Sequence, residues 1–205
     1  MKHKRLKIRL SLALMLGVLP SLARAADAQS DFAVRGTGAL SCAGFSTLGQ
    51  QAPAYRAMAL ENWMLGYLTA ENRLSSGTYD VMALQDPRVF LPLVSALCQT
   101  NPNTSVEMVV ASLVKQFMPI KIASNSPILT LSADKNQIQI RQATLVLVQK
   151  ALRARHYGRV LADGKFSPAL QQALEHFQQD QKLPVTGLPD SATIIRLLIE
   201  LPTKK

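Results

Sequence analysis

The sequence is poor in the residues on which metal sites and many active sites depend. In 205 residues it holds two cysteines, three histidines and one tryptophan, and charged residues make up only 18%. Zinc sites are built from closely spaced Cys and His ligands, and the chain contains neither H-E-x-x-H nor a pair of C-x-x-C motifs. We therefore expect no metal and no other cofactor.

Motifs that bind nucleotides or carry a catalytic serine are missing as well. The chain has no phosphate-binding loop, no dinucleotide fingerprint and no G-x-S-x-G turn. Two carboxylates could still meet in space and cleave a glycan, because sequence separation does not prevent such a pair. The sequence favours a protein that is not an enzyme.

The start of the chain has the order of a secretory signal peptide. Basic residues without an acid occupy positions 2–9, an apolar stretch fills 10–19, and the small-x-small sequence Ala23-Arg24-Ala25 precedes Ala26. The apolar stretch is short for a bilayer, so an uncleaved anchor is the weaker alternative. We expect residues 1–25 to be removed, the protein to be periplasmic, and no membrane contact to remain after cleavage.

Removing this leader changes the meaning of the net charge. The chain carries 23 basic and 13 acidic side chains, a net charge of +10, but six of the bases lie in residues 1–25. The net charge of residues 26–205 is only +4, so the high isoelectric point comes mostly from the bases of the signal peptide. No nucleic-acid partner is therefore expected. Residues 126–205 hold a net charge of +5, which suits an acidic polymer and equally an ordinary solvated face.

Cys42 and Cys98 are the two cysteines of the chain. A small, even number of cysteines in an exported protein predicts one disulfide. In the chain-entropy model a bridge between them stabilises the fold by roughly 4 kcal/mol. The bridge would also remove both thiols as candidate nucleophiles.

Hydrophobic spacing predicts an all-α fold with two helical blocks. In residues 26–118 it predicts an amphipathic helix over 54–72, a helix that delivers Cys98, and a helix opened by a capping box of Thr104 and Glu107. The acids of this block, Glu107 included, are expected at the solvated surface. The second block, residues 138–205, shows three short helices.

Several residues set the bounds of these later elements. Residues 119–137 lack clean periodicity and contain two prolines, which suggests a linker. Ser167 with Pro168, and later Asp190, are typical helix starts. The last helix should direct three side chains inward, those of Ile195, Leu198 and Ile199.

The motifs of the second block follow one another in a recognisable order. They are Val148–Leu152, His156–Gly158, Asp163–Pro168, Phe177-Gln178, Leu183–Gly187 and Asp190–Thr193. This block, over about residues 138–200, resembles the type 1 peptidoglycan-binding domain, a three-helix module of many wall hydrolases. It differs at Ser167, where the family usually has glycine, and at Leu170, where it usually has threonine.

The resemblance implies peptidoglycan as a partner. Wall glycan and stem peptides offer hydroxyls, amides and carboxylates, which a shallow groove with donors, cations and an aromatic face can bind. The candidate contacts are Arg153, Arg155, Tyr157, Arg159 and Gln178. The alternative is that Tyr157 packs in the fold and the arginines are merely solvated.

The first block carries a looser pattern. It consists of Ser41–Phe45, Trp63–Tyr67, Tyr79–Val81, Pro92–Val94 and Cys98–Pro102. Over about residues 40–118 this resembles the HdeA-type periplasmic acid-stress chaperones, whose disulfide falls at the positions of Cys42 and Cys98. Small periplasmic immunity proteins of toxin-secretion systems are similar at this level.

These features predict a non-catalytic periplasmic protein with a wall-binding C-terminal domain. The disulfide-stapled first block would then present a helical surface to an unidentified periplasmic protein. Three roles stay open for this block: a chaperone, an inhibitor of a toxin or wall hydrolase, and a scaffold held at the wall.

Overall fold

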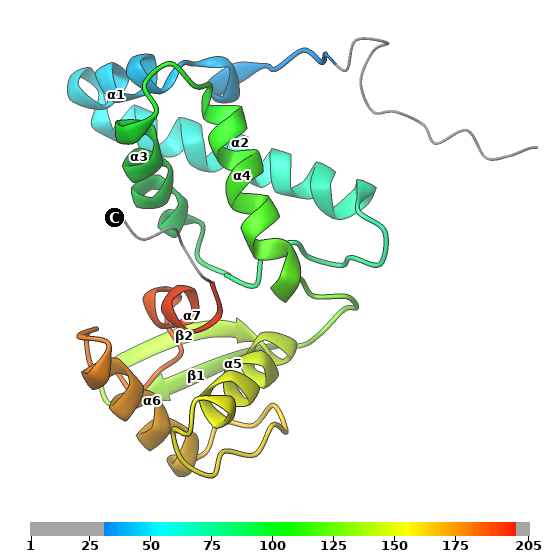
Figure 1. Cartoon of the computed structure of the whole chain (residues 1–205), viewed down its shortest axis with the longest axis vertical. Coiled ribbons are helices and arrows are strands. Elements are labelled where there is room, and N and C mark those ends of the chain that lie inside the picture. Colours follow the sequence, from blue (N-terminus) through cyan, green and yellow to red (C-terminus); the bar gives the residue numbers. More distant parts are fainter. Residues whose placement is uncertain (1–30, 200–205) are drawn as a thin grey trace, which may run out of the picture. The chain divides into compact units, whose positions relative to one another are not determined.

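A computed structural model of the chain, shown in Figure 1, describes residues 31–199. The predicted signal peptide, residues 1–25, lies outside this range. Every helix and strand given below lies within the unit Val34–Lys205. None of the helices within residues 31–199 combines the length and apolar character needed to span a bilayer.

Four helices form the first block. They are α1 (Cys42–Gln51), α2 (Pro53–Leu74), α3 (Phe90–Thr100) and α4 (Val106–Phe117), with short 3-10 turns at Gly36–Ala39, Pro87–Val89 and Met118–Ile120. α2 confirms the helix predicted over 54–72. Apolar side chains from α2, α3 and α4 form the core of this block, because each helix has one apolar face.

The disulfide between Cys42 and Cys98 is present and ties the start of α1 to the end of α3. Both cysteines are buried. The backbone N–H of Cys42 also donates to Thr104 O at 2.8 Å, which fixes the loop before α4 beside the bridge. The predicted bridge is therefore confirmed, and it lies inside the hydrophobic core.

Two predictions at the start of α4 are wrong. The N-cap is Ser105, which has extended backbone dihedrals and whose Oγ accepts the backbone N–H of Met108 at 3.2 Å. Glu107 is not solvated: it is 7% exposed and its Oε1 accepts the Tyr67 hydroxyl at 3.3 Å. A hydrogen-bond donor at this position allows the carboxyl group to lie in the interior.

A β-hairpin that the all-α prediction lacks begins within residues 119–137, the predicted linker, and joins the second block. Strand β1 (Ile128–Ala133) pairs antiparallel with β2 (Asn136–Arg141), with Leu131 opposite Ile138. The turn between the strands has Asp134 at φ 49°, a conformation that Asp tolerates. Each strand has only six residues, so its alternation of apolar and polar residues was too short to predict a strand. The nearby Pro119 and Pro127 favoured a linker instead.

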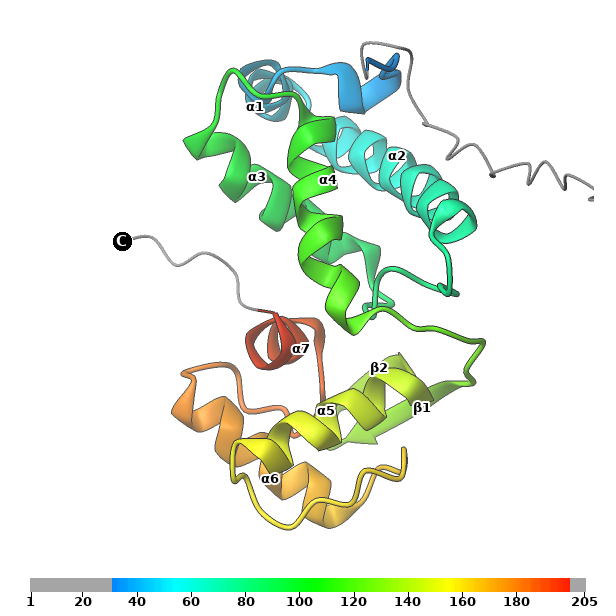
Figure 2. The ribbon, with the colours of Figure 1, turned by 45° about the vertical axis from the view of Figure 1, so that its right-hand side comes forward.

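Three helices complete this block: α5 (Gln142–Ala154), α6 (Pro168–Asp180) and α7 (Ser191–Leu198). The predicted caps are confirmed, since Ser167 Oγ accepts the N–H of Leu170 and Asp190 accepts that of Thr193. Figure 2 shows the three helices gathered about the hairpin, and α5 contacts β2, α6 and α7.

The inward face of α7 differs from the prediction. Ile194 and Leu197 are the buried residues, and Ile195 and Leu198 are only partly covered. The cause is Thr193, which is fully buried and hydrogen-bonded, so the helix is rotated to bring its neighbour Ile194 inward. Ile199, which follows the helix, is buried as expected.

Side-chain contacts join the hairpin and α5 to the segment between α2 and α3. Arg141 Nε lies 3.4 Å from Asp80 Oδ2, and its guanidinium lies over the ring of Tyr79. The hydroxyl of Thr144 donates to Ala83 O at 3.2 Å. Thr144 is fully buried, so this hydrogen bond is shielded from solvent.

Candidate functional site

Gln178, one of the five predicted ligand contacts, lies fully buried in α6. Its Nε2 donates to Leu188 O at 2.9 Å and to the hydroxyls of Thr186 and Thr193 at 3.0 and 2.9 Å. Its Oε1 accepts the backbone N–H groups of Thr186 and Gly187. A side chain without exposed surface cannot contact a polymer, so the prediction for Gln178 is wrong.

Gln149 of α5 plays the same structural part at another loop. It is 1% exposed, its Oε1 accepts the N–H of Gly164 at 2.8 Å, and its Nε2 donates to Asp163 Oδ1 and Lys165 O. The backbone N–H of Lys165, and then the Gln149 amide, hold the pKa of Asp163 below its usual value. Gln149 and Gln178 therefore shape loops and offer no surface to a ligand.

Tyr157 is engaged in packing. Its ring meets the Phe177 ring edge-on, with centroids 5.3 Å apart, and its hydroxyl donates to Asp180 Oδ2 at 3.0 Å. Partial burial, and then the Asp180 carboxylate, raise the pKa of Tyr157. This geometry agrees with the packing alternative for Tyr157, because both its ring and its hydroxyl already have partners.

Arg155 is partly committed to the fold. Its Nη2 donates to Leu197 O at 2.8 Å, in the last turn of α7, where a cation also interacts favourably with the helix dipole. The residue as a whole remains exposed. Arg155 therefore connects α5 to α7, and its guanidinium is less available to a ligand than those of its neighbours.

Arg153 and Arg159 line one shallow groove where α5 ends. The other lining residues are His156, Gly158, Val160 and Leu161. His156 and Gly158 have positive φ values of 65° and 82°, which fold the chain back sharply. Both arginines are exposed, and neither side chain has a hydrogen-bond or ion-pair partner within residues 31–199.

This groove combines the properties that a binder of wall polymers needs. Two guanidiniums can each hold a carboxylate through paired N–H donors, and the imidazole of His156 adds a polar group. Leu161 is 73% exposed at the rim and offers an apolar surface. The groove is open on the solvent side, so a chain can lie across it without threading an end.

His156 and Leu161 were not among the predicted contacts. His156 follows Arg153 by three residues, but this spacing alone only weakly predicts that the two side chains share a site. Positive φ values at His156 and Gly158 bring these side chains together, and His is among the residue types that favour this conformation. The sequence alone does not show which side chains such a turn gathers. No cluster of three His, Cys, Asp or Glu side chains suited to a metal occurs in the described part of the chain.

Comparison with known proteins agrees with the second block. Residues 141–197 match the family model of the peptidoglycan binding domain. Arg153, His156 and Arg159 lie within that range. Searches of curated proteins and of solved structures each returned no match to the chain.

The comparisons give no support to the HdeA-type resemblance of residues 40–118, since the match begins after that block. The chain therefore contains a peptidoglycan-binding domain, and its four-helix block is defined by its structure alone.

Proposed function

We propose that the protein binds peptidoglycan through the groove of Arg153, His156 and Arg159 and does not cleave it. The match of residues 141–197 to the peptidoglycan binding domain carries this proposal. The two guanidiniums without partners supply the chemistry, because stem peptides of the wall end in carboxylates. Tyr157 and Gln178 contribute indirectly, by holding the turn and the neighbouring loop in place.

The disulfide and the domain match both favour a location outside the cytoplasm. Structural disulfides persist in oxidising compartments, and the wall polymer lies in the same space. The periplasm is the compartment that the predicted signal peptide implies.

The four-helix block acts in this proposal as an interaction domain presented at the wall. Tyr55, Met58 and Leu65 of α2 are 57, 55 and 46% exposed, and the spacing of Tyr55 and Met58 puts them on one side of the helix. Protection of a model client from aggregation at acid pH would favour a chaperone. Tight binding of one periplasmic hydrolase or toxin at neutral pH would favour an inhibitor.

Co-sedimentation with purified peptidoglycan sacculi tests the wall-binding proposal. We expect residues 26–205 to pellet with sacculi, and the double variant Arg153→Ala/Arg159→Ala to bind about tenfold or more weakly, because charge-assisted hydrogen bonds contribute about 1.5–3 kcal/mol each. The matched control is Arg73→Ala/Lys150→Ala, which removes the same charge from exposed positions outside the groove.

Two results would contradict the proposal. Equal pelleting of the groove variant and the wild type would exclude the groove as the site. Release of soluble wall fragments by purified protein, above the level of a heat-denatured sample, would show that the protein is catalytic.

A further inference from the structure

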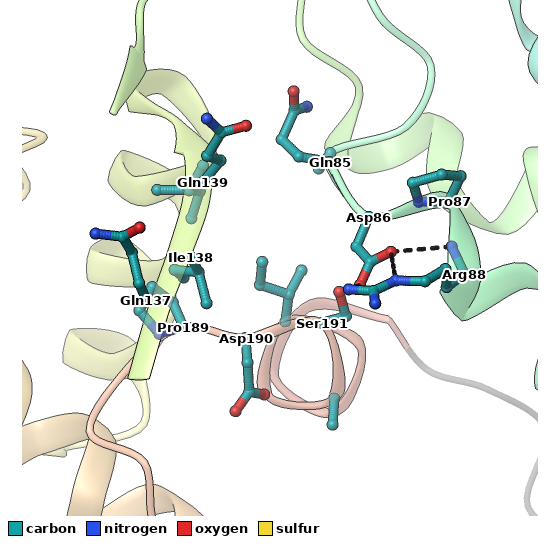
Figure 3. Close-up of a pocket in the computed structure, with 14 residues that line it drawn as sticks. Gln85, Asp86, Pro87, Arg88, Gln137, Ile138, Gln139, Pro189, Asp190 and Ser191 are labelled. Atoms are coloured by element: carbon teal, nitrogen blue, oxygen red, sulfur yellow. Dashed lines mark hydrogen bonds and ion pairs between the residues drawn. The ribbon is translucent and has the colours of Figure 1, made fainter. Parts of the chain in front are cut away.

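A second cavity, of about 570 Å³, opens between three segments that are far apart in the sequence. One wall is the loop of residues 83–88, the second is strand β2, and the third is the start of α7 from Pro189 onward (Figure 3). Its size falls in the range of sites for small ligands. None of its lining residues belongs to the groove of Arg153, His156 and Arg159, hereafter the arginine groove.

Glutamine side chains lie on two different walls of this cavity. Gln139 of β2 and Gln85 of the loop lie on opposite sides of it in Figure 3. Neither side-chain amide has a hydrogen-bond partner within residues 31–199, whereas Gln137, beside them, donates to Ser132 Oγ at 3.2 Å. Each free amide offers two donors and one acceptor oxygen to a ligand placed between them.

The charged groups at the cavity are already neutralised or hydrogen-bonded. Arg88 holds Asp86 through two bonds, Nε to Oδ1 at 2.8 Å and Nη2 to Oδ2 at 2.9 Å. Asp190 accepts the N–H of Thr193 with one oxygen and the hydroxyl of Thr186 with the other. An anionic ligand would therefore find no free cation in the lining, because Arg88 is held by Asp86.

Apolar surface lies between these polar groups, supplied by Pro87, Ile138, Pro189 and Ile194. A sugar ring has hydroxyl groups at its edge and C–H groups on its faces, and an acetamido substituent adds a donor, an acceptor and a methyl group. Neutral amides beside apolar side chains complement that mixture. Free carboxylates of a stem peptide are complemented less well.

We propose that this cavity binds an N-acetylated sugar unit of a glycan strand, with Gln85 and Gln139 as its polar contacts. The inference rests on the proposed function only for the source of the glycan, the wall. Gln85 lies outside residues 141–197, so the site uses the four-helix block as well as the wall-binding domain. A strand held here and at the arginine groove would be bound through both its sugars and its peptides.

Titration of residues 26–205 with a soluble tetramer of N-acetylglucosamine tests this site, by calorimetry or by amide chemical shifts. We expect the wild type to bind and Gln85→Ala/Gln139→Ala to bind about tenfold or more weakly, because two hydrogen bonds are lost. The control Gln99→Ala/Gln172→Ala removes two exposed glutamines that do not line the cavity and should bind within about twofold of wild type. Circular dichroism checks that all variants are folded.

The outcomes separate this proposal from the previous one. Pelleting with sacculi without binding of the tetramer would overturn the sugar site and leave wall binding intact. Binding of the tetramer without pelleting would overturn the wall proposal and support the sugar site. Equal affinity of the wild type and the Gln85/Gln139 variant for the tetramer would also overturn the sugar site, since the ligand would then bind elsewhere.

Discussion

Gln178 Oε1 accepts the backbone N–H of Gly187 at 3.0 Å, and Gly187 has a positive φ of 65°. Glycine adopts this left-handed conformation without the steric cost that other residues meet. The amide thus fastens the loop between α6 and α7 at the point where the chain turns. The loop in turn places Asp190, which caps α7.

Replacement of this amide should weaken the fold. We expect Gln178→Ala to lower the free energy of unfolding by about 2–4 kcal/mol, because the buried N–H of Gly187 loses its acceptor and Thr193 Oγ1 loses the amide that donates to it. Urea denaturation followed by circular dichroism measures the change. The neighbouring Gln179→Ala is the control, since Gln179 is exposed and should cost less than about 0.5 kcal/mol. Similar costs for both variants would contradict the structural role.

Arg141 and Asp80 offer a test of a shielded ion pair. Their side chains are 14% and 18% exposed, and Arg141 also donates to Ser126 O at 2.9 Å. A double-mutant cycle with Asp80→Asn and Arg141→Gln should give a coupling energy of about 1–2 kcal/mol.

The exposed pair of Asp86 and Arg88 is the matched control for that cycle. Its side chains are 40% and 82% exposed, so solvent screens their attraction and the same cycle should give no resolvable coupling. The distinction between shielded and exposed pairs would be refuted by equal coupling energies in the two cycles.

Local sequence rules predicted the elements whose determinants lie within a few residues. Ser167 and Asp190 cap helices as expected, since a cap needs only its own side chain and an N–H three residues later. The disulfide followed from the cysteine count and the predicted export. The hairpin was missed because pairing of β1 with β2 depends on contacts across strands, which a six-residue alternation does not reveal.

The types of residue at the candidate site could be predicted from the sequence better than the places that the fold gives them. The arginines at the end of α5 were among the predicted contacts, but burial separates Gln178 from them, and burial is decided by tertiary packing. The cavity with Gln85 and Gln139 could not be foreseen, because its walls come from three segments far apart in the sequence that have no motif in common.

Tyr67 should make the fold sensitive to alkaline pH. Burial, followed by the carboxylates of Glu107 and Glu71, raises the pKa of its phenol far above the usual value near 10. Above about pH 10 the unfolded state releases this proton while the folded state keeps it, so the free energy of unfolding falls as pH rises.

Comparison of two tyrosine variants measures this effect. The Tyr67→Phe variant should show a shallower loss of stability above about pH 10 than the wild type, in urea unfolding at a series of pH values. Tyr55→Phe, at a residue 57% exposed, should keep the wild-type slope. An unchanged slope in Tyr67→Phe would mean that another group causes the alkaline sensitivity.

Loss of the disulfide should destabilise the protein while sparing wall binding. Cys42 and Cys98 are 56 residues apart, and closing a loop of this length stabilises the folded state by about 4 kcal/mol in the chain-entropy model. Cys42→Ser/Cys98→Ser should therefore unfold at a lower urea concentration, and a reductant should have the same effect on the wild type only.

Wherever the variant is still folded, its pelleting with sacculi should stay within about twofold of wild type, because the arginine groove lies in the domain of residues 141–197. Loss of pelleting by a folded, disulfide-free variant would instead place the wall contact in the four-helix block.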